Sequence, residues 1–361
     1  MTRPDLELDY RPQLPRRKDM GIGIVGAGAI VEVAHLPAYQ KAGFRVAGVY
    51  DQDADRAAKT ASRFQIERVY GDLEQLLADP EVSIVDIATP PWGRKEMVQN
   101  AVAAGKHILC QKPLADTYPE AVEVVEIAEK GGVLLAVNQQ MRWDPLIRAS
   151  HLLLERGWMG DPFSVTIDVS IYTDWEAWTW LPKVETLDLM YHSIHYFDSL
   201  RFLLGLPERI YCTGSRYPGQ PSRGESHTIT VMEYPGPLRA LVAVNHNNWT
   251  DDRHATFRIE GTEGLVTGTF GLLYNYPHGR PDTMSFSSRA RYDQYRFDLR
   301  IADMWIPDAF VGPMASLMRA IEDGGTPETD GRDNLKTLQM VNAGYRSMAE
   351  ARAVRPEEAT A

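Results

Sequence analysis

Two glycines, Gly26 and Gly28, follow a short apolar run and precede a helical pattern. Glycines at this place permit a tight turn and let the backbone approach a pyrophosphate at the N-terminus of a helix, which here begins near Ala29 and Ile30. The alternative is an ordinary turn, and Val31 at the third fingerprint position makes the motif imperfect. The order of strand, glycine turn and helix nevertheless favours a dinucleotide site.

Asp51 ends the next apolar run and strengthens that prediction. A carboxylate there would accept hydrogen bonds from both hydroxyls of an adenosine ribose. It would also repel a 2′-phosphate, which favours NAD, whereas the nearby cation of Arg56 leaves NADP open.

A second group of chemistry-bearing side chains lies on a predicted helix over residues 188–204. At about 100° per residue, one side of this helix carries acid, phenol and imidazole groups, and the other side is apolar. Plain surface helices tend to present Lys and Glu, so we expect this side to face a catalytic cleft rather than bulk solvent. Its members are Asp188, Tyr191, His192, His195 and Asp198.

The same helix raises the question of a metal. Asp188 and His195 would lie two turns apart, about 10 Å along the axis, which is too far for one ion to bridge comfortably. His192 and His195 could act as ligands only with help from elsewhere. We expect no metal, because hydride transfer with a nicotinamide dinucleotide, the chemistry that the predicted dinucleotide site could support, does not require one.

Tryptophans crowd into the segment that leads to this helix, at Trp175, Trp178 and Trp180. Indole faces stack on the C–H surfaces of sugars, so Trp175 and Trp178 are candidate substrate contacts. A hydrophobic lid or a subunit contact explains them equally well.

The composition excludes several classes of function. A length of 361 residues predicts two domains, and the composition, 44% hydrophobic and 24% charged, is that of globular proteins. The 38 Lys and Arg against 49 Asp and Glu give a net charge of −11, so we expect neither nucleic acid nor a membrane surface as a partner. Cys110 and Cys212 are too few for a disulfide framework or a zinc set, which fits a reducing, cytoplasmic location.

An export signal is the competing interpretation of the first residues. Arg16 and Arg17 precede an apolar stretch, as in twin-arginine signals, but no small-residue cleavage site follows that stretch. The stretch is better explained as a first strand and glycine turn. We therefore expect residues 1–19 to form an arm outside the core.

The elements that must position these groups fall into two patterns. Up to about residue 139, continuous apolar runs alternate with helical patterns, which predicts a parallel sheet covered on both faces, a doubly wound α/β domain. Beyond Pro145, many half-apolar runs with few helices between them predict a large, mostly antiparallel open sheet in an α+β domain. The expected division is an arm over 1–19, an NAD(P)-binding Rossmann domain over 20–145, and a substrate-binding and oligomerisation domain over 146–361.

That open sheet is expected to need a partner. Helices would cover one face, and the 239–246 run is apolar on both sides, with Leu241 and Ala243 on one and Val242 and Val244 on the other. An uncovered apolar face predicts a homodimer or homotetramer.

Several segments, taken in order, carry a resemblance to a known family. They are GIVGAGAI (24–31), DIATPP (86–91), AGKHILCQKPLADT (104–117), NQQMRWDP (138–145), HSIHYFDSLRFLLG (192–205) and GRDNLKTLQMVNAGYRS (331–347). The set resembles the glucose–fructose oxidoreductase, inositol dehydrogenase and MocA family. The resemblance implies a Rossmann domain, an open-sheet domain, and oxidation or reduction of one carbon of a sugar, polyol or inositol with NAD or NADP.

The resemblance also implies roles for residues of the first domain. The family's Glu-Lys-Pro corresponds to Gln111, Lys112 and Pro113, in which the lysine contacts the reacting hydroxyl and the nicotinamide ribose and the proline is typically cis. Thr89 and Pro90 match the loop on the nicotinamide side, where Arg94 stands for the usual histidine. Cofactor contacts are also implied for Gln111, Lys112 and Gln140.

Arg142 matches the family's segment that enters the second domain. We expect substrate contacts from Arg142 and Trp143 there, and from His192 and His195 on the later helix. His195 takes the place of the catalytic histidine. The aspartate that normally supports that histidine is Tyr191 here, so we expect Tyr191 to orient the imidazole or a substrate hydroxyl.

Together these features predict an NAD(P)-dependent dehydrogenase of a sugar, sugar derivative or cyclitol. Lys112 would polarise the reacting oxygen and His195 would remove the hydroxyl proton. One rival is a redox-neutral enzyme that keeps its NAD, as in a glycosidase or a sugar-to-sugar hydride transfer. Another is a non-catalytic sugar or nucleotide sensor.

Overall fold

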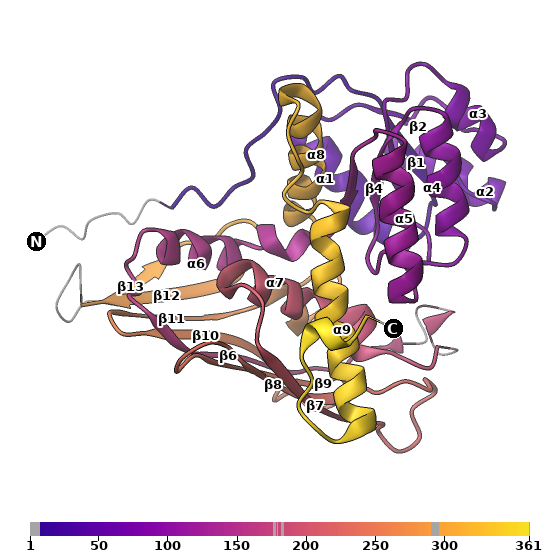
Figure 1. Cartoon of the computed structure of the whole chain (residues 1–361). Coiled ribbons are helices and arrows are strands. Elements are labelled where there is room, and N and C mark those ends of the chain that lie inside the picture. Colours follow the sequence, from indigo (N-terminus) through magenta and orange to yellow (C-terminus); the bar gives the residue numbers. More distant parts are fainter. Residues whose placement is uncertain (1–7, 176–177, 179, 182–183, 290–295, 361) are drawn as a thin grey trace, which may run out of the picture. The chain divides into compact units, whose positions relative to one another are not determined.

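In the computed structural model, residues 8–175, 178, 180–181, 184–289 and 296–360 are described (Figure 1). They form two compact units. The parallel-sheet unit comprises Pro12–Gln140 and Ile306–Leu335, and the open-sheet unit comprises 8–11, Met141–Trp305 and 336–360. Among the described residues, no helix is long and apolar enough to cross a membrane.

The parallel-sheet unit is built on five parallel strands in the order β2-β1-β3-β4-β5. An isolated parallel bridge joins Val49 of β2 to Val69. If this bridge is counted as an edge strand, the order becomes the 3-2-1-4-5-6 of dinucleotide-binding sheets. The strands are β1 (Ile22–Val25), β2 (Val46–Tyr50), β3 (Ile84–Ile87), β4 (His107–Cys110) and β5 (Leu135–Val137).

Helices connect these strands. Every residue of β1 and β3 is buried, as expected of central strands covered on both faces. Asp53 caps the second α-helix by accepting a hydrogen bond from the backbone N–H of Arg56, as its position predicts. The helical segments are η1 (Val31–His35), α1 (Leu36–Ala42), α2 (Ala54–Phe64), α3 (Leu73–Ala78), α4 (Arg94–Ala103), α5 (Tyr118–Lys130), η7 (Asp308–Phe310) and α8 (Val311–Asp323).

The open-sheet unit contains eight strands in the order β13-β12-β11-β10-β6-β9-β8-β7. Only β6 and β9 pair in parallel, so the sheet is mostly antiparallel, as the sequence predicts. The strands are β6 (Pro162–Ser170), β7 (Arg209–Ser215), β8 (His227–Glu233), β9 (Arg239–Asn245), β10 (His254–Gly261), β11 (Gly264–Thr269), β12 (Thr283–Ser288) and β13 (Arg296–Leu299).

Burial alternates along these strands, so one face of the sheet lies in the core. In β10, for example, Ala255, Phe257 and Ile259 are buried while Arg258 is exposed. The unit's helical elements are α6 (Pro145–Glu155), η5 (Asp188–Ser193), α7 (Ile194–Leu204), η6 (Gly271–Tyr274) and η8 (Pro356–Glu358). The helix α9 (Gly331–Glu350) belongs to this unit from Lys336 onward.

The two units differ from the expected division in three places. The boundary lies after Gln140 rather than after residue 145. Residues Ile306–Leu335, including α8, join the parallel-sheet unit instead of the second domain. The expected arm is also attached, because Arg16 forms an ion pair with Asp323 at 2.8 Å and Arg11 one with Asp303 at 2.7 Å. The first seven residues of that arm lie outside the described residues.

Candidate active site

Four predicted cofactor segments lie at one edge of the parallel sheet. Asp51 follows β2, Gly26 follows β1, Thr89 and Pro90 follow β3, and Gln111 follows β4. The strands are parallel and adjacent in the order β2-β1-β3-β4, so all four segments emerge at their carboxyl ends. Ligands of open parallel sheets bind at this edge, where the strand order reverses.

The glycine turn requires its glycines. Gly26 has φ +101°, which side-chain-bearing residues rarely adopt, and an added Cβ would lie 3.1 Å from the carbonyl oxygen of Ala88. Gly28 differs, because a Cβ there would have no neighbour within 4 Å among the described residues. The backbone at Gly28 is thus open to a ligand. Val31 is fully buried, which explains an apolar residue at the third fingerprint position.

Asp51 is oriented by the backbone around it. Its Oδ2 accepts a hydrogen bond from the Ala27 N–H at 2.7 Å, and its Oδ1 accepts one from the Asp53 N–H at 2.8 Å. Arg56 Nη1 lies 3.6 Å from Oδ1. These contacts fix the carboxylate beside the glycine turn, where the prediction requires a ribose ligand.

The chain therefore fits a dinucleotide on observations of its own. The glycine turn is open at Gly28, a fixed acid stands beside it, and Gln140 is buried with its Oε1 lacking a hydrogen-bond partner among the described residues. A buried orphan acceptor of this kind is accounted for when a ligand donates to it.

Arg94 binds backbone rather than a ligand. The side chain is 1% exposed and donates to the carbonyl oxygens of Gln111 at 2.6 Å and Leu114 at 3.2 Å. It also donates to the carbonyls of Thr89 and Pro113. Arg94 thereby ties the loop after β3 to the loop after β4, a role that the sequence did not reveal.

Gln111 rests on a buried polar network. Its Nε2 lies 3.1 Å from His35 Nε2, and its Oε1 accepts the Lys112 N–H at 2.9 Å. His35 Nδ1 in turn lies 2.7 Å from Asp86 Oδ2, which also accepts a hydrogen bond from the Tyr39 hydroxyl at 2.7 Å. If His35 donates from Nδ1 to Asp86, its Nε2 is the acceptor for the Gln111 amide. An amide at position 111 satisfies this network without an added charge.

Lys112 follows directly and carries a perturbed amine. The Lys112–Pro113 bond is cis, as the family resemblance implies. Desolvation, followed by the repulsion of the Arg94 guanidinium, lowers the pKa of Lys112 to about 7. The amine can therefore donate or accept a proton near neutral pH.

In the open-sheet unit, the helix of the predicted stripe begins as a π-helical turn, η5, before α7. The wider turn changes which side chains share a side. Asp188, His195 and Asp198 are all buried, and the carboxylates of Asp188 and Asp198 bond to different protein groups, His246 and Arg142. The predicted side chains therefore do not form one continuous exposed stripe.

Asp198 and Arg142 form a buried ion pair. Arg142 Nε and Nη2 donate to the two carboxylate oxygens of Asp198 at 2.7 and 2.8 Å, and Thr337 donates to Oδ1 at 2.6 Å. The Coulombic attraction and hydrogen bonds of Arg142 outweigh burial and keep the pKa of Asp198 below its usual value. These contacts commit the two Arg142 nitrogens to the protein interior. Trp143 is likewise buried, beneath the guanidinium of Arg148.

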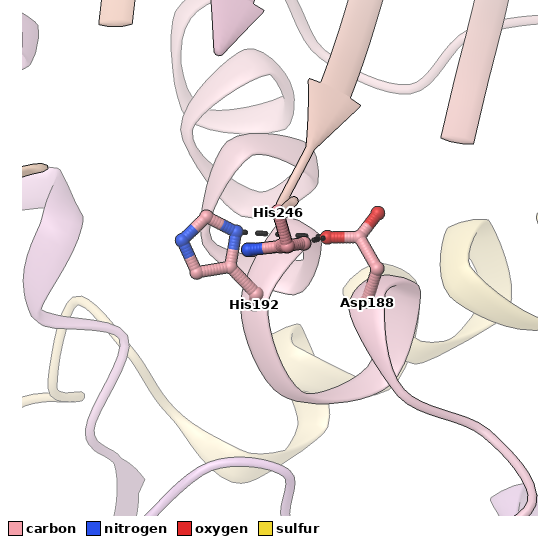
Figure 2. Close-up of side chains that lie close together, drawn as sticks. All are labelled: Asp188, His192 and His246. Carbon is pink, nitrogen blue, oxygen red and sulfur yellow. Dashed lines mark hydrogen bonds and ion pairs between the residues drawn. The ribbon is translucent and has the colours of Figure 1, made fainter. Parts of the chain in front are cut away.

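Asp188 lies at the centre of a second buried network (Figure 2). Its Oδ1 lies 2.9 Å from His246 Nε2, and the hydroxyls of Ser193 and Thr228 donate to the same carboxylate. His192 Nδ1 lies 3.6 Å from Oδ1. Burial alone would raise the pKa of Asp188, but the two imidazoles reverse this effect and hold it below the usual value.

Aromatic rings surround these histidines. Trp175 meets His246 edge-on at 4.6 Å between centroids, Trp178 packs near Trp175, and Trp305 meets His195 edge-on at 5.3 Å. Tyr191 packs against Trp180 at 5.2 Å.

A pocket of about 290 Å³ lies beside Trp175 within the open-sheet unit. It is lined by side chains that include Tyr172, Trp175, Tyr217 and Trp249. These rings provide apolar faces beside polar groups, the combination that binds sugar rings.

Sequence reasoning missed His246, Trp305 and the partners of Gln111. His246 follows the end of β9, far along the chain from Asp188, and no spacing rule connects the two. His35 lies in the helical segment η1, and its partner Asp86 lies in β3. No sequence pattern connects the two residues.

Comparison with known proteins gives a consistent result. The model of the "Oxidoreductase family, NAD-binding Rossmann fold" matches residues 20–139, and the "GFO/IDH/MocA C-terminal domain" matches residues 147–267. D-apiose dehydrogenase of Paraburkholderia graminis is 28% identical, over 89% of this chain and 85% of its own. Trans-1,2-dihydrobenzene-1,2-diol dehydrogenase of Mus musculus is 31% identical, over 68% of this chain and 73% of its own.

Solved structures share the fold. An oxidoreductase from Agrobacterium radiobacter, in complex with NAD+, L-tartaric acid and magnesium, has a TM-score of 0.80 at 24% identity and covers 94% of this chain and 99% of its own. Levoglucosan dehydrogenase in complex with NADH and L-sorbose has a TM-score of 0.78 at 21% identity, with coverages of 93% and 98%. Both family models and the diol dehydrogenase point to the same family, and the glycine turn at the carboxyl edge of the parallel sheet fits it. The chain belongs to the Gfo/Idh/MocA family of oxidoreductases, with an NAD-binding Rossmann domain.

Proposed function

We propose that the protein is an NAD(P)-dependent dehydrogenase that acts on a hydroxyl-bearing carbon of a sugar, sugar derivative or cyclitol. The observation that carries the proposal is the row of segments at the carboxyl edge of the parallel sheet. It runs from Asp51 through the glycine turn and Thr89 to Lys112, whose pKa is about 7. This row supports the proposal, because Lys112 would then be an acid–base group at the end of a dinucleotide site.

The substrate class rests on relatives and on the aromatic pocket. The names of relatives include D-apiose dehydrogenase, 1,5-anhydro-D-fructose reductase and D-xylose 1-dehydrogenase. The pocket beside Trp175 supplies the ring faces that a carbohydrate needs.

The residues would divide the reaction as follows. When bound, NAD would supply the acceptor for a hydride from the substrate carbon, and residues of this chain would take the hydroxyl proton. Lys112 would hold the substrate oxygen, and Gln111 and Arg94 would fix the backbone on either side of Lys112. His195 remains the proposed proton acceptor, its ring position set by Trp305. Tyr191 would orient the imidazole or a substrate hydroxyl.

The experiment is an absorbance assay for NADH formation with aldoses, ketoses, inositols and anhydro-sugars. Lys112→Ala and His195→Ala should each lower kcat by about 100-fold or more, the usual effect of losing a positioned acid–base group. Tyr191→Phe should cost only about 1–2 kcal/mol, the value of one hydrogen bond.

A loss in Tyr191→Phe equal to that in His195→Ala at every pH would make Tyr191 the proton acceptor. Turnover with no net NADH would instead indicate redox-neutral chemistry.

The proposed location is the cytoplasm. Cys110 and Cys212 are both buried as free thiols, and burial raises the pKa of each to about 12. Neither thiol is activated, so both behave as small apolar side chains. Free cysteines are typical of proteins in a reducing compartment, which supports the proposed location.

A further inference from the structure

Three side chains of metal-ligand type meet in the open-sheet unit, and the proposed hydride transfer uses none of them as its base. Asp188 and His192 come from η5, and His246 follows β9. One potential ligand atom from each lies within 4.8 Å of the other two, and Figure 2 shows the side chains converging. The cluster combines one carboxylate with two imidazoles.

The two distances from Asp188 suit ligands around one ion. Asp188 Oδ1 lies 2.9 Å from His246 Nε2 and 3.6 Å from His192 Nδ1. Two ligands of a tetrahedral zinc ion, each about 2.0–2.1 Å from the metal, lie about 3.3 Å apart. The two separations bracket this value. The longer one exceeds the usual length of a hydrogen bond.

Outer hydrogen bonds hold the ligands in place. Thr228 and Ser193 donate to Asp188 Oδ2 at 2.5 and 2.9 Å, and Ser193 also reaches Oδ1 at 2.8 Å. Thr173 Oγ1 lies 2.8 Å from the other ring nitrogen of His246, Nδ1. Partners of this kind fix the orientation of metal ligands, because the atom that does not bind the metal is hydrogen-bonded.

We propose that Asp188, His192 and His246 bind a divalent cation of the zinc class. The site would have three protein ligands and a fourth position for water or a substrate hydroxyl, the arrangement of accessible zinc sites. The side chain of His192 is 16% exposed, whereas those of Asp188 and His246 are fully buried, so the ion enters on the His192 side. Zinc would take Nε2 of His246, and the ring N–H would then stand at Nδ1, where the Thr173 hydroxyl can accept it.

The test starts from metal-free protein prepared with a chelator. Co²⁺ should produce the visible absorption of a tetrahedral site at one ion per chain, and Zn²⁺ should displace it. Titration calorimetry with Zn²⁺ should give the same stoichiometry of one ion per chain. His192→Ala should weaken Zn²⁺ binding by about 100-fold or more, since a ligand is lost. Thr173→Val should weaken it by about 10-fold without removing a ligand.

A matched control is available on the surface. His254 lies 3.4 Å from Asp168 on exposed strand positions, so His254→Ala removes a histidine–aspartate pair outside the cluster and should leave Zn²⁺ binding unchanged. His246→Ala removes a buried ligand, so its folding is checked by circular dichroism. His192→Ala and Thr173→Val still decide the question if that variant does not fold. Absence of the tetrahedral cobalt spectrum, or equal Zn²⁺ affinity in His192→Ala and the unmutated protein, would overturn the proposal. Neither readout depends on dehydrogenase activity.

Discussion

Lys112 shows how one side chain obtains its chemistry from its surroundings. Desolvation and the Arg94 cation both disfavour the ammonium form, and Gln111 provides no negative charge to oppose them. Below pH 7 the group is mainly an ammonium donor, and above pH 7 it is mainly an amine acceptor. A substrate hydroxyl would therefore meet a group able to exchange its proton at physiological pH.

This leads to a prediction that does not require the substrate. In competitive acetylation followed by mass spectrometry, Lys112 should react with a midpoint near pH 7, about three units below an ordinary lysine. Gln111→Glu should raise the midpoint by about one unit, because a carboxylate stabilises the ammonium. Lys95, which pairs with Glu123 and has a raised pKa, is the internal control. A Lys112 midpoint near 10 would contradict the assignment.

Asp51 gives a second prediction at this scale. Its carboxylate is fixed by the Ala27 and Asp53 N–H groups, and it stands where a 2′-phosphate would need a cation. Asp51→Ala combined with Gln52→Arg should shift the ratio of kcat/KM for NAD and NADP toward NADP by about 10-fold or more. Asp55→Ala, on the exposed first turn of α2, is the control. An unchanged ratio would show that Asp51 is not the ribose ligand.

At the scale of elements, the sequence pattern predicted helices and strands correctly where the backbone follows regular geometry. The continuous apolar runs became parallel strands, and Asp53 capped its helix. The pattern failed where the backbone left regular geometry. The segment η5 is π-helical before α7 begins, so a constant 100° per residue does not describe the position of Asp188. A π turn depends on tertiary contacts such as those of Asp188 with β8 and the end of β9, which periodicity does not contain.

Two buried acids join α6 to the loop before β12. Asp144 caps α6 through the Leu146 and Ile147 N–H groups, and Asp282 accepts the Gly271 N–H at 2.7 Å. Burial is the main reason that both pKa values are raised, that of Asp282 to about 6. An acid with a raised pKa binds its proton more tightly in the folded state. The stability it contributes is therefore full below about pH 4 and is lost as the pH rises through 6.

Asp282→Asn should remove this loss. We expect the free energy of unfolding to rise by about 1–3 kcal/mol at pH 8 and to change little at pH 4, as measured by denaturant titration at both pH values. Asp298→Asn, an exposed change on β13, should have no such dependence. An equal gain at both pH values would indicate that titration of Asp282 is not the cause.

For the whole molecule, the chain path explains why the expected division was incomplete. The Val137 N–H of β5 donates to the carbonyl of Thr329, and Asp330 pairs with Ala136, so a distant segment covers the edge of the parallel sheet. Arg332 adds an ion pair with Glu129 in α5. Covering an edge strand prevents unwanted pairing. The sequence pattern predicts β5 as the last strand of the parallel sheet. It does not predict the segment that covers this strand, because that segment lies nearly 200 residues further along the chain.

The outer face of the open sheet leads to the last prediction, a homo-oligomer. Tyr211, Val231 and Leu241 lie side by side across β7, β8 and β9, and Ile229 stands in the next row. Tyr211 is 44% and Ile229 is 40% exposed. A contiguous apolar patch on a regular sheet is suited to burial against a second copy, because a two-fold axis makes the surface self-complementary.

Light scattering at about 10 μM should therefore give at least twice the 40.6 kDa of one chain. Val231→Glu should reduce the mass toward that of the monomer, since association would bury an unpaired carboxylate. Thr267→Glu, on β11 of the same sheet but outside the patch, should leave the mass unchanged. A monomeric mass for the unmutated protein would show that this face does not pair, and equal dissociation by both variants would place the interface elsewhere on the sheet.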